Sequence, residues 1–84
     1  MITTNQYTVG TTAVKVVPSH EGYRNASIHQ NAGTVYLGGT SAVTTSTGFL
    51  LDNTSGPFTF QVGPLDEVWA IATISHTVTA LVSI

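Results

Sequence analysis

The sequence FTFQVGPLDEVWAIAT, residues 58–73, contains two runs of alternating side chains, separated by a turn. The first run, Phe58–Val62, alternates phenylalanine and valine with polar residues, and Glu67–Thr73 alternates Val68, Ala70 and Ala72 with the larger Trp69 and Ile71. A period of two is typical of a strand with one buried face. The intervening Gly63-Pro64-Leu65-Asp66 has turn composition. This stretch therefore predicts two strands joined by a turn.

The rest of the chain repeats this pattern. Short apolar runs recur roughly every 8–12 residues with turn residues between them, as in sandwiches and barrels, and no window has the apolar spacing of a helix. We expect Gly33 to adopt a positive φ in a tight hairpin turn at residues 31–33. The predicted fold is all-β, a small antiparallel sandwich or barrel of jelly-roll or Greek-key type. Its eight short strands are expected at Tyr7–Val9, Ala13–Val17, Ala26–Gln30, Thr34–Leu37, Phe49–Leu51, Phe58–Val62, Glu67–Thr73 and Thr77–Ser83.

The 84 residues are enough for one domain. We expect residues 1–6, which are polar and lack strand alternation, to form a flexible N-terminal arm, and residues 7–84 to form a single β domain. The chain has no cysteine, so no disulfide stabilises it. A domain this small has a marginal core, and we therefore expect it to be stabilised by other copies of the same chain.

The scarcity of charge excludes several classes of partner. Only 7% of residues are charged, against roughly 25% in ordinary globular proteins, and Lys15 and Arg24 are the only basic residues besides histidine. Two cations cannot form the basic surface that nucleic acid or an anionic membrane requires. The N-terminus has no signal-peptide pattern, and no apolar run approaches the ~18–20 residues of a membrane span. We expect no nucleic-acid or membrane partner.

No catalytic or metal-binding pattern is present in the sequence. The histidines His20, His29 and His76 have no ligand spacing such as H-E-x-x-H. The adjacent carboxylates Asp66 and Glu67 should point to opposite faces of a strand, which separates them too far for paired acid–base chemistry. Phosphate-loop and nucleophile-elbow motifs are also absent. We therefore expect a protein that is not an enzyme and has no cofactor.

The candidate contact residues are few. Trp69 is expected in the core or at a subunit contact, with a carbohydrate-binding platform as the alternative. Tyr23 and Arg24 adjoin in a predicted loop, residues 19–25, where an aromatic side chain is a candidate contact. The expected arm contributes further candidates for contacts with a partner or another subunit: Ile2, Thr3, Thr4, Asn5 and Gln6.

Residues 28–51, IHQNAGTVYLGGTSAVTTSTGFLL, resemble a pattern found in small virion proteins of tailed bacteriophages: Asn and Gly before a strand, then V-Y-L/I-G-G, V-T-x-x-T-G and an apolar pair. VGPLDEVWAIA (residues 62–72) is similar to the Gly-Pro turn and strand that follow there, and YTVGTT (residues 7–12) fits the pattern's start. The resemblance covers about residues 7–72. The chain departs from it at residues 52–57, DNTSGP, where the pattern has a Gly-rich turn with an acidic residue.

This resemblance implies a β-sandwich that decorates (cements) the phage head. Such a protein binds the outer capsid surface as a homotrimer, with the major capsid protein as partner, and is found on the virion after assembly in the host cytoplasm. The expected arm would then order on the capsid. The alternative is a tail or fibre module that binds a receptor or glycan through loops such as residues 19–25 or 40–47. The family pattern offers no agreed functional residues to transfer to this chain.

Overall fold

The computed structural model describes residues 1–30, 33–52 and 57–83 and confirms the all-β prediction. No helix among these residues is long and apolar enough to cross a membrane. The strands in chain order are β1 (Ile2–Val9), β2 (Val14–Val17), β3 (Arg24–Gln30), β4 (Thr34–Gly38), β5 (Phe49–Asp52), β6 (Phe58–Val62), β7 (Val68–Ile71) and β8 (His76–Ser83).

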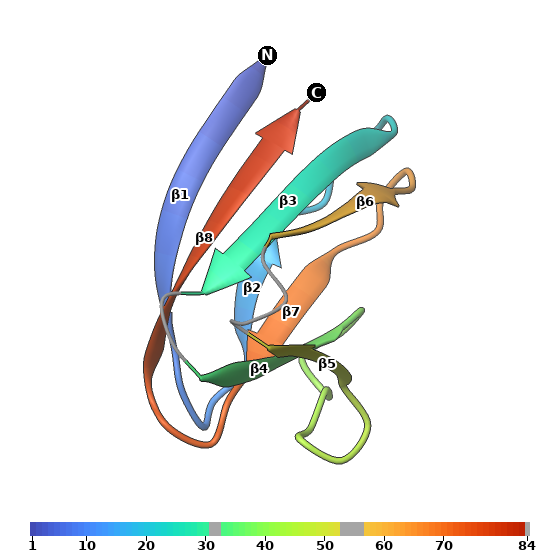
Figure 1. Cartoon of the computed structure of the whole chain (residues 1–84). Helices are drawn as coiled ribbons and strands as arrows, with labels where there is room; N and C mark the ends of the chain where they lie inside the picture. Colours follow the sequence, from blue (N-terminus) through green and yellow to red (C-terminus); the bar gives the residue numbers. More distant parts are fainter. Residues whose placement is uncertain (31–32, 53–56, 84) are drawn as a thin grey trace.

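The strands form two antiparallel four-stranded sheets, with orders β1-β8-β3-β6 and β2-β7-β4-β5 (Figure 1). Four of the strand pairs are β1 with β8, β2 with β7, β3 with β6 and β4 with β5, so the first half of the chain pairs with the second half in reverse. The pairs β3–β8 and β4–β7 join these ribbons side by side. This is the strand order of an eight-stranded jelly roll, made of two Greek keys.

The core between the sheets is aliphatic. Alternation directs one side chain in two inward, and these inward residues are mainly valine and alanine. No aromatic side chain belongs to the fully buried core cluster in the part of the chain that the structure describes. The cluster contains Val9, Val16, Val17, Ala26, Ile28, Val35, Leu37, Leu51, Val62, Ala70, Ala72, Val78, Ala80 and Val82.

The structure does not show a separate N-terminal arm. Residues 2–6 are the first part of β1, and the strand pairs with β8 along its whole length, from Ile2 opposite Ser83 to Val9 opposite His76. The polar composition of this segment hides the strand from sequence analysis, because β1 is an edge strand held mainly by backbone hydrogen bonds and buries few side chains. The expected boundary at residue 7 therefore falls inside a strand.

The two sides of the sandwich differ. On one side β1 lies against β2, so the edges of the two sheets meet. On the other side the edge strands are β5 in one sheet and β6 in the other, and they do not pair with each other. The inner faces of these two strands are consequently only partly covered. This open side holds the apolar groove described next.

Candidate interaction surfaces

The open side of the sandwich gathers all three phenylalanines of the chain. Phe49 from β5 stacks on Phe58 from β6, with ring centroids 5.0 Å apart, and Phe58 stacks on Phe60 at 5.1 Å. Alternation directs Phe58 and Phe60 to the inner face of β6, as the sequence predicts. Because β6 is an edge strand, no strand of the other sheet covers them fully, and both rings remain half-buried.

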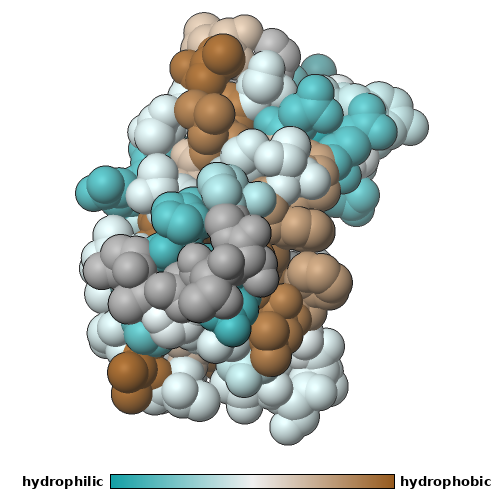
Figure 2. Space-filling view, in the orientation of Figure 1, coloured by the Kyte–Doolittle hydropathy of each residue, from teal (hydrophilic) through white to brown (hydrophobic). Residues whose placement is uncertain are grey.

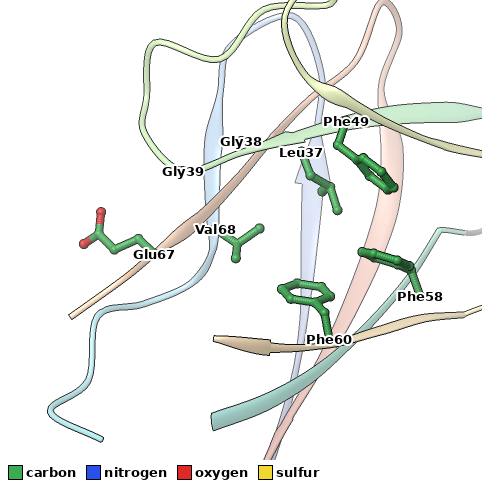
Figure 3. A pocket seen from close by; sticks show the side chains of 8 residues that line it. All are labelled: Leu37, Gly38, Gly39, Phe49, Phe58, Phe60, Glu67 and Val68. Atoms are coloured by element: carbon green, nitrogen blue, oxygen red, sulfur yellow. The ribbon is translucent and has the colours of Figure 1, made fainter. Parts of the chain in front are cut away.

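These rings line a groove of about 310 Å³. Figure 3 shows Phe49, Phe58 and Phe60 directed toward a common space, whereas the Glu67 side chain points away from them. Phe49 is 56% exposed. In the space-filling view, apolar residues gather along the side where β5 and β6 lie (Figure 2). The groove is lined by Leu37, Gly38, Gly39, Phe49, Phe58, Phe60, Glu67 and Val68.

Arg24 is buried, in contrast to the loop contact expected from the sequence. It begins β3 and is 2% exposed. Its Nη2 donates to the carbonyl oxygens of Gly63 at 2.8 Å and Asp66 at 2.9 Å, and its Nη1 donates to the carbonyl of Pro18. These carbonyl dipoles offset part of the cost of burying the guanidinium, whose Nε is buried without a hydrogen-bond partner among the described residues. Arg24 therefore ties the β2–β3 loop to the β6–β7 turn.

The β6–β7 turn presents an exposed leucine in a fixed position. Leu65 has φ 64°, a left-handed conformation that is rare for a branched residue, and its side chain is 69% exposed. Its N–H donates to the carbonyl of His20 at 2.7 Å, and its carbonyl accepts from Ser19 Oγ at 3.4 Å. Together with the Arg24 bonds on either side, these contacts hold the strained residue at the tip of the turn.

Trp69 lies on the outer face of β7, not in the core, because its neighbour Ala70 occupies the inward position. It is half-buried, and its Nε1 donates to Glu67 Oε1 at 3.1 Å. Lys15 on the adjacent β2 lies 5.4 Å from the indole ring and pairs with Glu67 Oε2 at 3.1 Å. The Trp69 hydrogen bond, followed by Lys15, lowers the pKa of Glu67. The chain's only tryptophan and only lysine thus form a small polar cluster on this face.

The structure brings some of the predicted contact residues together and separates others. Thr3 and Asn5 of β1 line a cavity of about 80 Å³ that Arg24 also lines. Tyr23, next to Arg24, is exposed at 66%, so the two neighbours do not act as one contact. The remaining residues from the expected arm (Ile2, Thr4 and Gln6) are exposed on β1, and Trp69 lies in the other sheet.

The phenylalanine groove is the surface that sequence reasoning missed. The alternation in Phe58–Val62 correctly predicts which side chains face inward. It carries no information about which strands end a sheet, so the incomplete cover of these rings has no local sequence signal. The concentration of all phenylalanines within residues 49–60 is the one feature that could have indicated a local aromatic cluster.

Within the described ranges, no group of three or more His, Cys, Asp or Glu side chains could hold a metal ion. In comparisons with known proteins, no family model, no curated protein and no solved structure matches the chain. Its function is therefore inferred from the fold, from these surfaces and from the sequence resemblance.

Proposed function

We propose that the chain is a bacteriophage head decoration protein, without enzymatic activity, that binds the outer capsid surface as a homotrimer and stabilises the shell. The observation that carries this proposal is the position of the three phenylalanines. Phe49, Phe58 and Phe60 all lie in an open groove, while valine and alanine fill the core. Exposed apolar clusters of this kind mark protein–protein contacts. A module built for assembly accounts for this arrangement.

The outer face of the β1-β8-β3-β6 sheet suits adhesion to a protein shell. Charged side chains do not occur on this face, because Arg24, the one charged residue of these four strands, is buried. Hydroxyl groups are frequent there, and Ser27 and Thr59 form a hydrogen bond of 2.8 Å across β3 and β6. Binding through such a face depends little on salt concentration. Many copies that prefer the assembled shell would stabilise it by mass action and avidity.

The jelly-roll strand order is compatible with the proposed capsid role. This architecture occurs in viral capsid proteins and also in lectins, so the fold alone does not select a function. The resemblance of residues 7–72 to small tailed-phage virion proteins favours the first of these classes. Capsid decoration is therefore the first choice.

A specific observation favours a second candidate, a receptor- or glycan-binding module of a phage tail or fibre. Trp69 is half-exposed beside Lys15 and Glu67, and an aromatic ring flanked by charged hydrogen-bonding groups is suited to stacking on a sugar. In this alternative, saturable glycan binding would quench Trp69 fluorescence.

The test is cosedimentation with empty heads assembled from the major capsid protein of the virus that encodes the chain. The proposal predicts saturable binding to assembled heads, little binding to unassembled capsid protein, and little change between low and high salt. Titration with a panel of glycans, followed by Trp69 fluorescence, runs in parallel. Glycan binding without head binding would overturn the first proposal in favour of the second, and binding to neither would overturn both.

A further inference from the structure

A small cavity at the side where β1 lies against β2 places a buried positive charge beside polar side chains. The cavity has a volume of about 80 Å³. Among the residues that line it, Arg24 and Val16 are buried, whereas Asn5 and His20 are exposed. The cavity therefore connects the surface with the guanidinium group. We propose that it is a binding site for a carboxylate group, held by Arg24.

Arg24 carries a charge that its own hydrogen bonds leave uncompensated. Its three acceptors, the carbonyl oxygens of Pro18, Gly63 and Asp66, are all neutral groups. Its Nε is buried without a hydrogen-bond partner among the described residues. No acidic residue belongs to the described residues that line the cavity. Burying a cation without a counterion is costly, and an anion beside the guanidinium lowers this cost through a charge-assisted hydrogen bond.

The inward positions of β1 are polar at this cavity. In the β1–β8 pair, Thr3 lies opposite Val82 and Asn5 lies opposite Ala80, and both partners belong to the buried core. Residues directly opposite each other in an antiparallel pair share one face of the sheet, so Thr3 and Asn5 occupy inward positions. Elsewhere in the sandwich these positions hold mainly valine and alanine. A polar ligand in the cavity accounts for a hydroxyl and an amide at these two positions.

The polar side chains around the cavity are able to donate hydrogen bonds. Nδ1 of His20 accepts from the N–H of Gly22 at 3.2 Å, so the neutral imidazole carries its proton on Nε2, which is a donor. The amide of Asn5 and the hydroxyl of Thr3 are donors too. An ionised carboxylate only accepts hydrogen bonds, on two oxygens, and it carries the charge opposite to that of Arg24. It therefore matches this set of groups.

The size of the cavity limits the ligand to a small group. A cavity needs only about 10–15 Å³ to hold one water molecule, so about 80 Å³ admits a group of several atoms. Pockets for drug-sized ligands begin at roughly 300 Å³. The site thus suits the carboxylate of a small organic acid, such as formate or acetate, or that of an aspartate or glutamate side chain of another protein.

The test uses the fact that Arg24 is the one arginine in the sequence. Its Nε–H therefore gives the one arginine signal in a proton–nitrogen correlation NMR spectrum of the wild-type chain. Sodium acetate replaces sodium chloride stepwise at constant pH and ionic strength. We expect this signal to shift in a saturable way, and the melting temperature to rise and level off over the same range of acetate concentration. A signal that stays in place would overturn the proposal.

Substitutions at Asn5 test the site without changing Arg24, and both variants are expected to fold because position 5 is exposed. Asn5→Leu removes a donor and should raise the dissociation constant of acetate about 10-fold. Asn5→Asp supplies a carboxylate from the chain itself and should abolish the response to acetate. Gln6→Leu and Gln6→Asp are matched controls on the other face of β1 and should respond like the wild type. An unchanged response in both Asn5 variants would overturn the assignment of the cavity.

A capped aspartate, N-acetyl-aspartic acid amide, distinguishes the two sources of the carboxylate. Tighter binding of this compound than of acetate would support an acidic side chain of a partner protein, and binding of acetate alone would support a small organic acid. These titrations involve neither phage heads nor the mass of the oligomer. The carboxylate site and the proposed function therefore stand or fall separately.

Discussion

Phe49 of β5 stacks on Phe58 of β6 with ring centroids 5.0 Å apart and ring planes inclined by 27°. The two strands are the edges of different sheets, so this pair joins the sheets at the open side of the sandwich. The contact has two consequences. It closes the core where backbone pairing ends, and it leaves one aromatic face accessible to a partner.

Phe58→Ala should lower the free energy of unfolding by about 1–3 kcal/mol, less than the roughly 3–5 kcal/mol for a fully buried phenylalanine, because Phe58 is half-buried. Urea denaturation measures this at a dilution where the chains are dissociated. Phe49→Ala is the matched control and should cost less, because Phe49 is the more exposed partner. Equal losses for the two variants would show that Phe58 does not close the core.

Arg24→Met should lower the free energy of unfolding by about 3 kcal/mol, because three carbonyl oxygens then lose a charged donor. Arg24→Lys should recover less than half of the loss, since a single ammonium group cannot reproduce the fork of the guanidinium. Lys15→Met, which breaks a partly exposed ion pair, should cost under about 1 kcal/mol. Chemical denaturation of the three variants measures the loss in the free energy of unfolding that each substitution causes. A smaller loss for Arg24→Met than for Lys15→Met would contradict the role assigned to Arg24.

Gly33→Ala should destabilise the fold by about 1–3 kcal/mol. Gly33 has φ 70°, and a Cβ there would lie 2.4 Å from Cε1 of His76. Combining Gly33→Ala with His76→Ala should restore the part of the loss that comes from this collision, which a double-mutant cycle measures. Gly39→Ala is the control, because a Cβ at Gly39 meets nothing within 4 Å. An additive cycle would show that the imidazole does not limit this position.

The lowered pKa of Glu67 predicts an acid-sensitive contribution to stability. The carboxylate is favoured in the folded state by Trp69 Nε1 and by Lys15, so its stabilising contribution is fully present above the ordinary pKa of 4.5 and disappears as the pH falls through the lower folded value. The stability difference between the wild type and Glu67→Gln should therefore shrink as the pH falls below about 4.5. Trp69→Phe removes the hydrogen bond that lowers the pKa of Glu67 most, so this variant should weaken the pH dependence. Thermal melts across this pH range test it, and a difference that is constant with pH would contradict the assignment.

Much of the fold could be predicted from the sequence because the strands carry a clear period of two. The eight strands, the inward face of Phe58–Val62 and the positive φ of Gly33 are all confirmed. The expected hairpin at residues 31–33 is wrong, because β3 and β4 lie in different sheets and pair with other strands. Residues 31 and 32 of that turn, and most of the departure from the family pattern at residues 52–57, lie outside the described residues. The sequence does not distinguish the jelly-roll strand order from other Greek-key orders, since pairing between distant strands leaves no local pattern.

The errors share a physical cause, because each depends on tertiary context. Residues 2–6 form a strand without apolar alternation, since the backbone pairing with β8 determines it. Arg24 is buried because carbonyl oxygens from two distant loops converge on it, and its charge alone predicts a surface position. For Trp69 the structure excludes only the core, because Ala70 occupies the inward position of β7, and the expected subunit contact stays a prediction. The groove exists only because β5 and β6 are edge strands.

The molar mass of the purified wild-type chain, measured by light scattering after size exclusion across a dilution series, tests the proposed homotrimer directly. We expect a mass of three chains that persists on dilution and falls only at low concentration. A folded chain with the mass of a monomer at every concentration would contradict it.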